Sequence, residues 1–211
     1  MIAINKPVPL LKDPDTESLT SEIRALPQKV AKLKAYPARY QPVTLDFQGA
    51  EAQAEPGIAD KALRFPVKSG GKVPIPMMKG EQQFTVSFWV KADKEGSWDG
   101  GIVDVQYFET FSLDIVQAKV RLNAQGKWFY GGTNPMPITE WTHLAVTCDG
   151  SIMRLYRDGR LVMALPGERP LHWPAAMTFG AGNFRGVFDG IAVYKTALPA
   201  DEVERLYLTV K

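Results

Sequence analysis

Cysteine, histidine and long apolar runs are scarce in this chain of 211 residues, which has a single cysteine, Cys148, and two histidines. A secreted domain that depends on disulfides would carry an even set of cysteines, so that class is excluded. No segment approaches the roughly 18 consecutive apolar residues of a membrane-spanning helix, and we expect no signal peptide because the start lacks a basic region followed by an apolar one. The formal net charge of +2 gives no electrostatic reason to expect nucleic acid or an anionic membrane as a partner.

Residues 1–41 form a proline-rich segment that we expect to be an N-terminal arm, separate from a domain over 42–211. Pro7–Leu11 should be extended, and Asp13 followed by Pro14 is typical of a helix start. Apolar residues then recur at spacings of 3 and 4, which places them on one face of a helix that Pro27 kinks or divides. A helix this short needs a surface to lie on, either its own sandwich or another subunit. The arm residues expected to contact a partner are Leu10, Leu11, Leu19, Ile23, Leu26, Val30 and Leu33.

From residue 42 onward, apolar and polar residues alternate in short runs that turn residues separate, which predicts β-strands. The runs are Val43–Phe47, Phe84–Val90, Phe111–Ile115, Thr142–Thr147 and Met153–Arg157. Asp149-Gly150 and Asp158-Gly159 predict hairpin turns, so that 142–162 would form a meander of three strands. One short helix is expected near Leu198–Tyr207. The pattern predicts an all-β fold, a two-sheet antiparallel sandwich or jelly roll.

Five segments of the chain form an ordered series, namely Lys61–Phe65, Phe84–Lys91, Trp141–Gly150, Leu155–Gly159 and Phe188–Leu198. In this order they resemble motifs of the laminin-G-like jelly rolls in the concanavalin-A-like lectin/glucanase superfamily, and the resemblance covers about 43–207. It implies two antiparallel sheets packed face to face. Phe84, Val86 and Phe88 would then point to one face and the residues between them to the other. The resemblance also implies that Trp89, Trp141 and His143 are packing residues.

The sequence lacks the carboxylate pattern of the superfamily's glucanases, which place their catalytic acids at alternating positions of one strand. The nearest pair, Asp104 and Glu109, is five residues apart, so a straight strand would turn the two side chains to opposite faces. No nucleophile motif, phosphate-binding loop or dinucleotide fingerprint is found in the sequence. We therefore expect no catalytic residues and no enzymatic activity.

Metal binding and cofactors are also not expected. Relatives that bind calcium place acidic residues after the early strand and in the closing motif, where this sequence has Lys68, Lys72 and Gly190–Ala192. Cations at such a position oppose binding of a hard cation. His143 and His172 are too isolated in sequence to indicate a zinc site. Cys148 lies in an alternating run and is expected to be a buried thiol.

Glycan recognition without a metal remains open, since sugars stack on exposed aromatic rings and are held by a few polar groups. The candidate residues are Trp98, Asp99, Trp128, Tyr130, Asn134 and Trp173. For Trp128 and Tyr130 the alternative is an ordinary strand with one buried side.

Two functions of different classes follow. The first is a non-catalytic structural or interaction protein, a jelly roll anchored by residues 1–41 to a protein partner or a second copy in a larger assembly, for example a virion decoration, head-fibre or tail protein. The alternative is a carbohydrate-binding module or adhesin that recognises a glycan through exposed aromatics. We expect the protein on the surface of a virion or another extracellular assembly, or alternatively secreted. The fold alone cannot choose, because it supports many functions.

Overall fold

The computed structural model describes residues 40–58, 61–93, 99–106, 109–116, 119–130, 138–167 and 170–210, without the side chains of Asp99, Lys119 and Tyr130. The predicted arm contacts, from Leu10 to Leu33, lie outside these residues and stay predictions.

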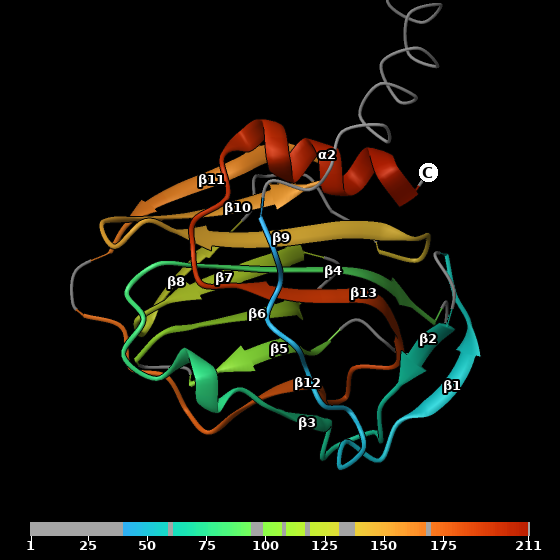
Figure 1. Ribbon diagram of the computed structural model, residues 1–211. Coiled ribbons are helices and arrows are strands. Elements are labelled where there is room, and N and C mark those ends of the chain that lie inside the picture. The colour runs from blue at the N-terminus through green and yellow to red at the C-terminus, as the bar shows by residue number, and fades with distance from the viewer. Residues whose placement is uncertain are drawn as a thin grey trace, which may run out of the picture. The chain divides into compact units, whose positions relative to one another are not determined.

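Two antiparallel sheets form the fold, as the alternation predicts (Figure 1). The seven-stranded sheet has the order β1 (Gln53–Pro56), β2 (Lys61–Arg64), β13 (Gly186–Tyr194), β4 (Phe84–Ala92), β9 (Thr142–Cys148), β10 (Ile152–Arg157) and β11 (Arg160–Pro166). The six-stranded sheet has the order β3 (Gly71–Pro74), β12 (Ala176–Gly182), β5 (Asp99–Val105), β6 (Phe111–Val116), β7 (Lys119–Ala124) and β8 (Lys127–Tyr130). A short 3-10 helix, η1 (Pro76–Met78), and the helix α2 (Ala200–Val210) complete the described elements.

The core lies between the sheets because β4 turns every second residue toward the opposite sheet. Phe84, Val86 and Phe88 are fully buried there. The Phe84 ring stacks on Phe111 of the other sheet with 5.2 Å between ring centroids, and Phe88 meets Phe179 edge to face at 5.7 Å. Such aromatic pairs stabilise the packing beyond the area that they bury. The predicted orientation of β4 is thus confirmed.

The predicted meander is also confirmed, since β9, β10 and β11 are neighbours in the seven-stranded sheet. Its second turn has φ of 49° at Asp158 and 76° at Gly159. Two successive positive φ angles match the right-handed twist of the flanking strands, and glycine adopts such an angle at little cost. The Asp158 carboxylate also accepts a hydrogen bond of 3.0 Å from the backbone N–H of His143, which ties the turn to β9.

One predicted strand, Val43–Phe47, is wrong. The segment forms no ladder, although the Val43 N–H donates to the Val193 carbonyl at 2.7 Å. Val43, Leu45 and Phe47 are only partly buried against the main core. The alternation in the sequence therefore reflects which side chains are buried, and a strand needs a row of backbone partners in addition.

The outer face of the seven-stranded sheet carries α2 over part of its area (Figure 1). Tyr207 of this helix stacks on Trp89 of β4, with 5.6 Å between ring centroids. Val203 is fully buried in a second, smaller core that includes Tyr156 and Leu198. The helix thus covers the middle of this face, and its described contacts do not extend to the part near the β1–β2 hairpin.

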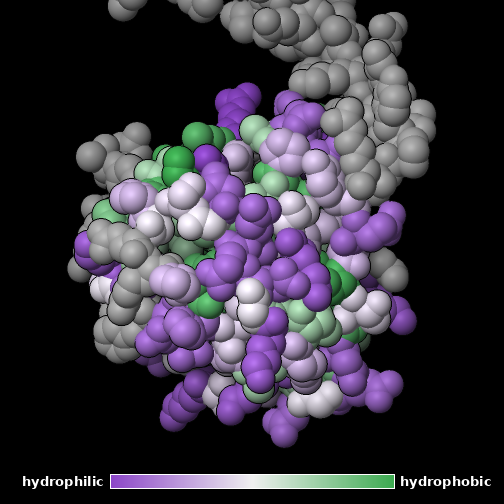
Figure 2. Space-filling model, turned by 60° about the vertical axis from the view of Figure 1, so that its left-hand side comes forward, coloured by the Kyte–Doolittle hydropathy of each residue, from purple (hydrophilic) through white to green (hydrophobic). Residues whose placement is uncertain are grey.

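Hydrophilic residues cover most of the face shown in Figure 2, and hydrophobic residues form separate small patches among them. In the described part of the chain, the large hydrophobic residues with high exposure are Val67, Ile152 and Leu161. Ile152 and Leu161 lie on the neighbouring strands β10 and β11, and Val67 lies between β2 and β3. Single exposed hydrophobic residues of this kind are ordinary for a protein surface. The view in Figure 2 therefore does not indicate an extended apolar docking face.

Candidate functional site

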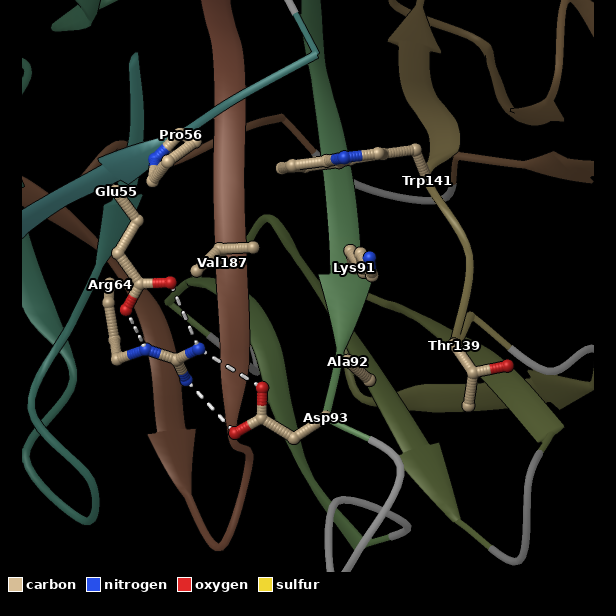
Figure 3. A pocket seen from close by; sticks show the side chains of 9 residues that line it. All are labelled: Glu55, Pro56, Arg64, Lys91, Ala92, Asp93, Thr139, Trp141 and Val187. Carbon is tan, nitrogen blue, oxygen red and sulfur yellow. Dashed lines mark hydrogen bonds and ion pairs between the residues drawn. The ribbon is translucent and has the colours of Figure 1, made fainter.

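A pocket of about 330 Å³ lies on the outer face of the seven-stranded sheet, at the end of β4 (Figure 3). Its floor comes from β4 and β13, where Lys91 and Val187 are direct cross-strand partners and so point to the same side. The β1–β2 hairpin forms one wall through Glu55 and Arg64, and the segment before β9 forms the other through Trp141. Pro56, Ala92, Asp93 and Thr139 complete the lining.

Arg64 is held between two carboxylates in this pocket. Its Nε and Nη2 bond to the two oxygens of Glu55, the latter at 3.3 Å. Nη1 and Nη2 donate to the two oxygens of Asp93 at 3.0 and 3.1 Å. The hydrogen bonds that Arg64 donates to Glu55 and then to Asp93 outweigh the opposing effect of burial and raise the pKa of Arg64 above its usual range. This two-sided arrangement fixes the direction of the guanidinium plane and of both carboxylates.

The energetic weight of this ion cluster is small. The side chains of Arg64, Glu55 and Asp93 are 30%, 36% and 41% exposed, so water screens their attraction. The cluster therefore serves mainly to orient its side chains in the pocket and adds little to the stability of the fold. Each carboxylate oxygen that accepts from Arg64 still has a lone pair that can accept a further hydrogen bond from a ligand.

Trp141 supplies a half-buried aromatic surface to the pocket. Figure 3 shows its ring edge-on above Lys91, so that one flat face is turned toward the pocket interior. Trp141 lies two residues before His143, and residues two apart in an extended chain project to the same face. Trp141 therefore projects to the same outer face as His143 and Trp89. Tyr207 packs on Trp89 and His143. The sequence suggested that Trp141 is a packing residue, but it lies beyond the described ring contacts of α2 and is only half-buried.

Trp89 and His143 do have the predicted packing role. They are 2% and 1% exposed, and the two rings lie 5.3 Å apart. His143 Nε2 is 2.9 Å from the Ser87 hydroxyl. Burial alone lowers the pKa of His143 to about 4, so the ring is neutral near pH 7. Cys148 is likewise buried, and this burial raises the pKa of its thiol.

Trp128 and Trp173, two of the residues that the sequence suggested for glycan binding, are not among the described residues that line the Trp141 pocket. Trp128 lies on β8 of the other sheet, where the Arg121 guanidinium covers one ring face at 4.2 Å. Arg121 Nε in turn donates to Asp114 at 2.8 Å. Asp99 and Tyr130 are the first residue of β5 and the last of β8, and Trp98 and Asn134 lie outside the described residues.

Trp173 packs as part of the structure. Its Nε1 donates to the Glu81 carbonyl at 2.9 Å, and its ring meets Phe84 edge to face at 5.1 Å. Both its polar group and one ring edge are thus engaged within the protein. His172, next to it, is exposed in a loop.

The described residues contain no group of three or more metal-binding side chains. Asp104 lies on β5, and Glu109 lies in the turn that follows the strand. In the pocket, Glu55 and Asp93 are both bonded to Arg64, so neither is placed as a free general acid of the kind that glycoside hydrolysis needs. None of the helices in the described ranges combines the length and apolar character needed to cross a membrane.

Residues 67–204 match the family model described as the concanavalin A-like lectin/glucanases superfamily. No curated protein sequence matches the chain. Among solved structures, the binding domain of Paraclostridial Mosquitocidal Protein 1 is similar with a TM-score of 0.62 and 16% identity, over 83% of this chain and 52% of that one.

Two further structures are similar. A structure of botulinum neurotoxin type C, whose cell entry depends on interaction with two ganglioside molecules, has a TM-score of 0.62 and 14% identity over 82% of this chain and 47% of that one. Domain 4 of AbnA, an extracellular arabinanase from Geobacillus stearothermophilus, in complex with arabinotriose, has a TM-score of 0.58 and 20% identity over 80% of this chain and 89% of that one. The chain spans about half the length of the two toxin chains, and identities this low show the fold alone.

Proposed function

The chain belongs to the concanavalin A-like lectin/glucanase superfamily, and we propose that it is a non-catalytic module that binds a glycan in the pocket beneath Trp141. The observation that carries this proposal is the aromatic face of Trp141 in a pocket that is also lined by charged, hydrogen-bonding side chains. A sugar presents an apolar ring face and a rim of hydroxyls, which this combination complements.

The size and rigidity of the pocket support the same function. A volume of about 330 Å³ lies at the small end of ligand pockets in proteins. The floor is a paired sheet, and Arg64 fixes the two carboxylates before any ligand arrives. Because these groups are already ordered, binding should lose little conformational entropy.

The comparisons favour binding over catalysis. The similar structures are named as binding domains of toxins and as a domain of an arabinanase in complex with arabinotriose. In the described part of this chain, the carboxylates nearest to the pocket are engaged by Arg64. We propose an extracellular place of action, with residues 1–41 as an anchor to a larger assembly, which is compatible with glycan binding by the sandwich.

A glycan array with the full chain tests the proposal, followed by titration calorimetry on the best hits. We expect Trp141→Ala to weaken binding at least about tenfold, since it removes the aromatic platform. Trp128→Ala is the matched control, because it removes a half-buried tryptophan from the opposite sheet. A folded Trp141→Ala protein with unchanged affinity would contradict the proposal. Loss of binding in Trp128→Ala alone would move the site to the other sheet.

A further inference from the structure

The arrangement of charges in the pocket limits the kind of glycan that it can hold. Two carboxylates, Glu55 and Asp93, face two cations, Arg64 and Lys91, so the formal charges of the lining cancel. A pocket with an excess of one sign would attract a ligand of the opposite sign, whereas this one does not.

Arg64 is not available to receive an anion. A guanidinium has five N–H donors, and four hydrogen bonds already join Arg64 to Glu55 and Asp93. The paired N–H groups that would grip a carboxylate, sulfate or phosphate of a ligand are therefore engaged within the protein. An acidic ligand would have to displace one of two ordered carboxylates.

Lys91 is the other cation of the pocket, and its ammonium forms no ion pair in the part of the chain that the structure describes. Lys91 lies near the end of β4 and Asp93 directly follows the strand, so the two side chains start about 7 Å apart. A ligand anion close to Lys91 would therefore also lie close to the Asp93 carboxylate. Attraction to one would be offset by repulsion from the other, while the anion would lose water of hydration.

Neighbouring hydroxyls of a neutral sugar match the same two side chains. A hydroxyl both donates and accepts hydrogen bonds, whereas an ammonium only donates and a carboxylate only accepts. One hydroxyl can accept from Lys91 while the adjacent hydroxyl donates to a free lone pair of Asp93. The apolar face of the sugar ring would then lie against the Trp141 ring above them (Figure 3).

From these contacts we infer that the pocket selects a neutral sugar that carries two adjacent free hydroxyls, held between Lys91 and Asp93, and discriminates against acidic sugars. This inference rests on the proposed function, because it assumes that the ligand of the Trp141 pocket is a glycan. Within the pocket, Lys91 supplies the donor, Asp93 the acceptor, and Arg64 holds the acceptor in place.

The test uses the full chain and paired probes: neutral glucose- and galactose-based oligosaccharides, and the same compounds with the terminal residue oxidised at C6 to the uronic acid. We expect the uronic acid to bind at least about tenfold more weakly, and the affinity for the neutral compound to change less than about twofold between 50 and 500 mM NaCl. Periodate oxidation, which cleaves the carbon–carbon bond between the two hydroxyl-bearing carbons to give two aldehydes, followed by borohydride reduction of these to alcohols, should abolish binding.

Lys91→Met should weaken binding of the neutral probe about tenfold, and Lys72→Met is the matched control, an exposed lysine on β3 of the other sheet. Equal or tighter binding of the uronic acid, with Trp141→Ala still losing affinity, would overturn the inference and leave the proposed function standing. Unchanged binding of the neutral probe by Lys91→Met would also overturn it. If no saccharide binds the wild-type chain, both the inference and the proposed function fail.

Discussion

At the scale of single residues, His143 shows how burial under α2 changes the protonation of a side chain on the sheet. The ring lies between Trp89 and Tyr207, at 5.3 and 6.2 Å between centroids, and its Nδ1 has no hydrogen-bond partner among the described atoms. A charged imidazole in this position would be poorly solvated, and burial lowers the pKa of His143 to about 4. The residue is a buried aromatic group that tolerates protonation badly.

His143 makes the stability of the fold depend on pH. Because the pKa is about 6.5 in the unfolded chain and about 4 in the folded one, the unfolded state gains the proton first as pH falls. We expect the free energy of unfolding to decrease from pH 6.5 to pH 4, by at most about 3 kcal/mol, and this contribution to level off below pH 4. Urea unfolding at several pH values measures it.

His143→Gln should remove the contribution of His143 to the pH dependence of the free energy of unfolding between pH 6.5 and 4. This holds whether or not the variant is less stable than the wild type at pH 7. Although burial alone would raise it, hydrogen bonds from Arg154 and Ser151 hold the pKa of Asp149 well below its usual range, so that carboxylate titrates at lower pH. Equal slopes for the wild type and His143→Gln in this window would refute the assignment to His143.

At the scale of elements, α2 is held to the sheet by a few large contacts. Val203 is fully buried and Leu198 is 3% exposed, and the N–H groups of Glu202 and Val203 donate to the Pro199 carbonyl at the helix start. Asp201 and Glu202 lie in the first turn, where the helix dipole favours negative charge. Packing against the sheet, and not intrinsic propensity, accounts for an 11-residue helix.

Tyr207→Ala should loosen this contact. Loss of the ring that covers Trp89 is expected to lower the free energy of unfolding by about 2 kcal/mol and to shift tryptophan fluorescence to longer wavelength. The neighbouring Leu208→Ala is the control, because Leu208 belongs to neither core cluster. Equal effects of the two substitutions would mean that α2 is not held through the Trp89 contact.

The strands were predictable because their signals are local. The alternation of Phe84–Val90 and the Asp158-Gly159 turn each specify a structure within a few residues, and both form as expected. The pocket was not predictable in this way. Arg64 lies 9 residues from Glu55 and 29 from Asp93, and only the pairing of the strands brings the three together. The sequence indicates that Trp141 projects to the same face as His143, but it does not indicate how much of that face α2 covers.

At the scale of the whole molecule, the expected role of residues 1–41 is open to a direct measurement. Tyr40 packs against the second core cluster, so a truncated chain should begin at Tyr40 to keep this contact. By light scattering we expect the full chain to form an oligomer or to bind a partner, and the truncated chain to be a folded monomer. Two identical monomers without a partner would mean that the arm is not a latch.

The attachment of the β1–β2 hairpin gives the pocket a further property. In the described ladders, β2 pairs with β13 only at Leu63 and Phe188, so few backbone bonds hold the hairpin to the sheet. The Arg64–Asp93 contact joins the hairpin to β4 through side chains. The hairpin should therefore make brief local openings from its ordered state more readily than the central strands β4 and β9, and its amides should exchange with deuterium earlier than theirs. A ligand seated between the hairpin and β4 would slow that exchange, so hydrogen–deuterium exchange over 53–64 can report occupancy before any ligand is identified.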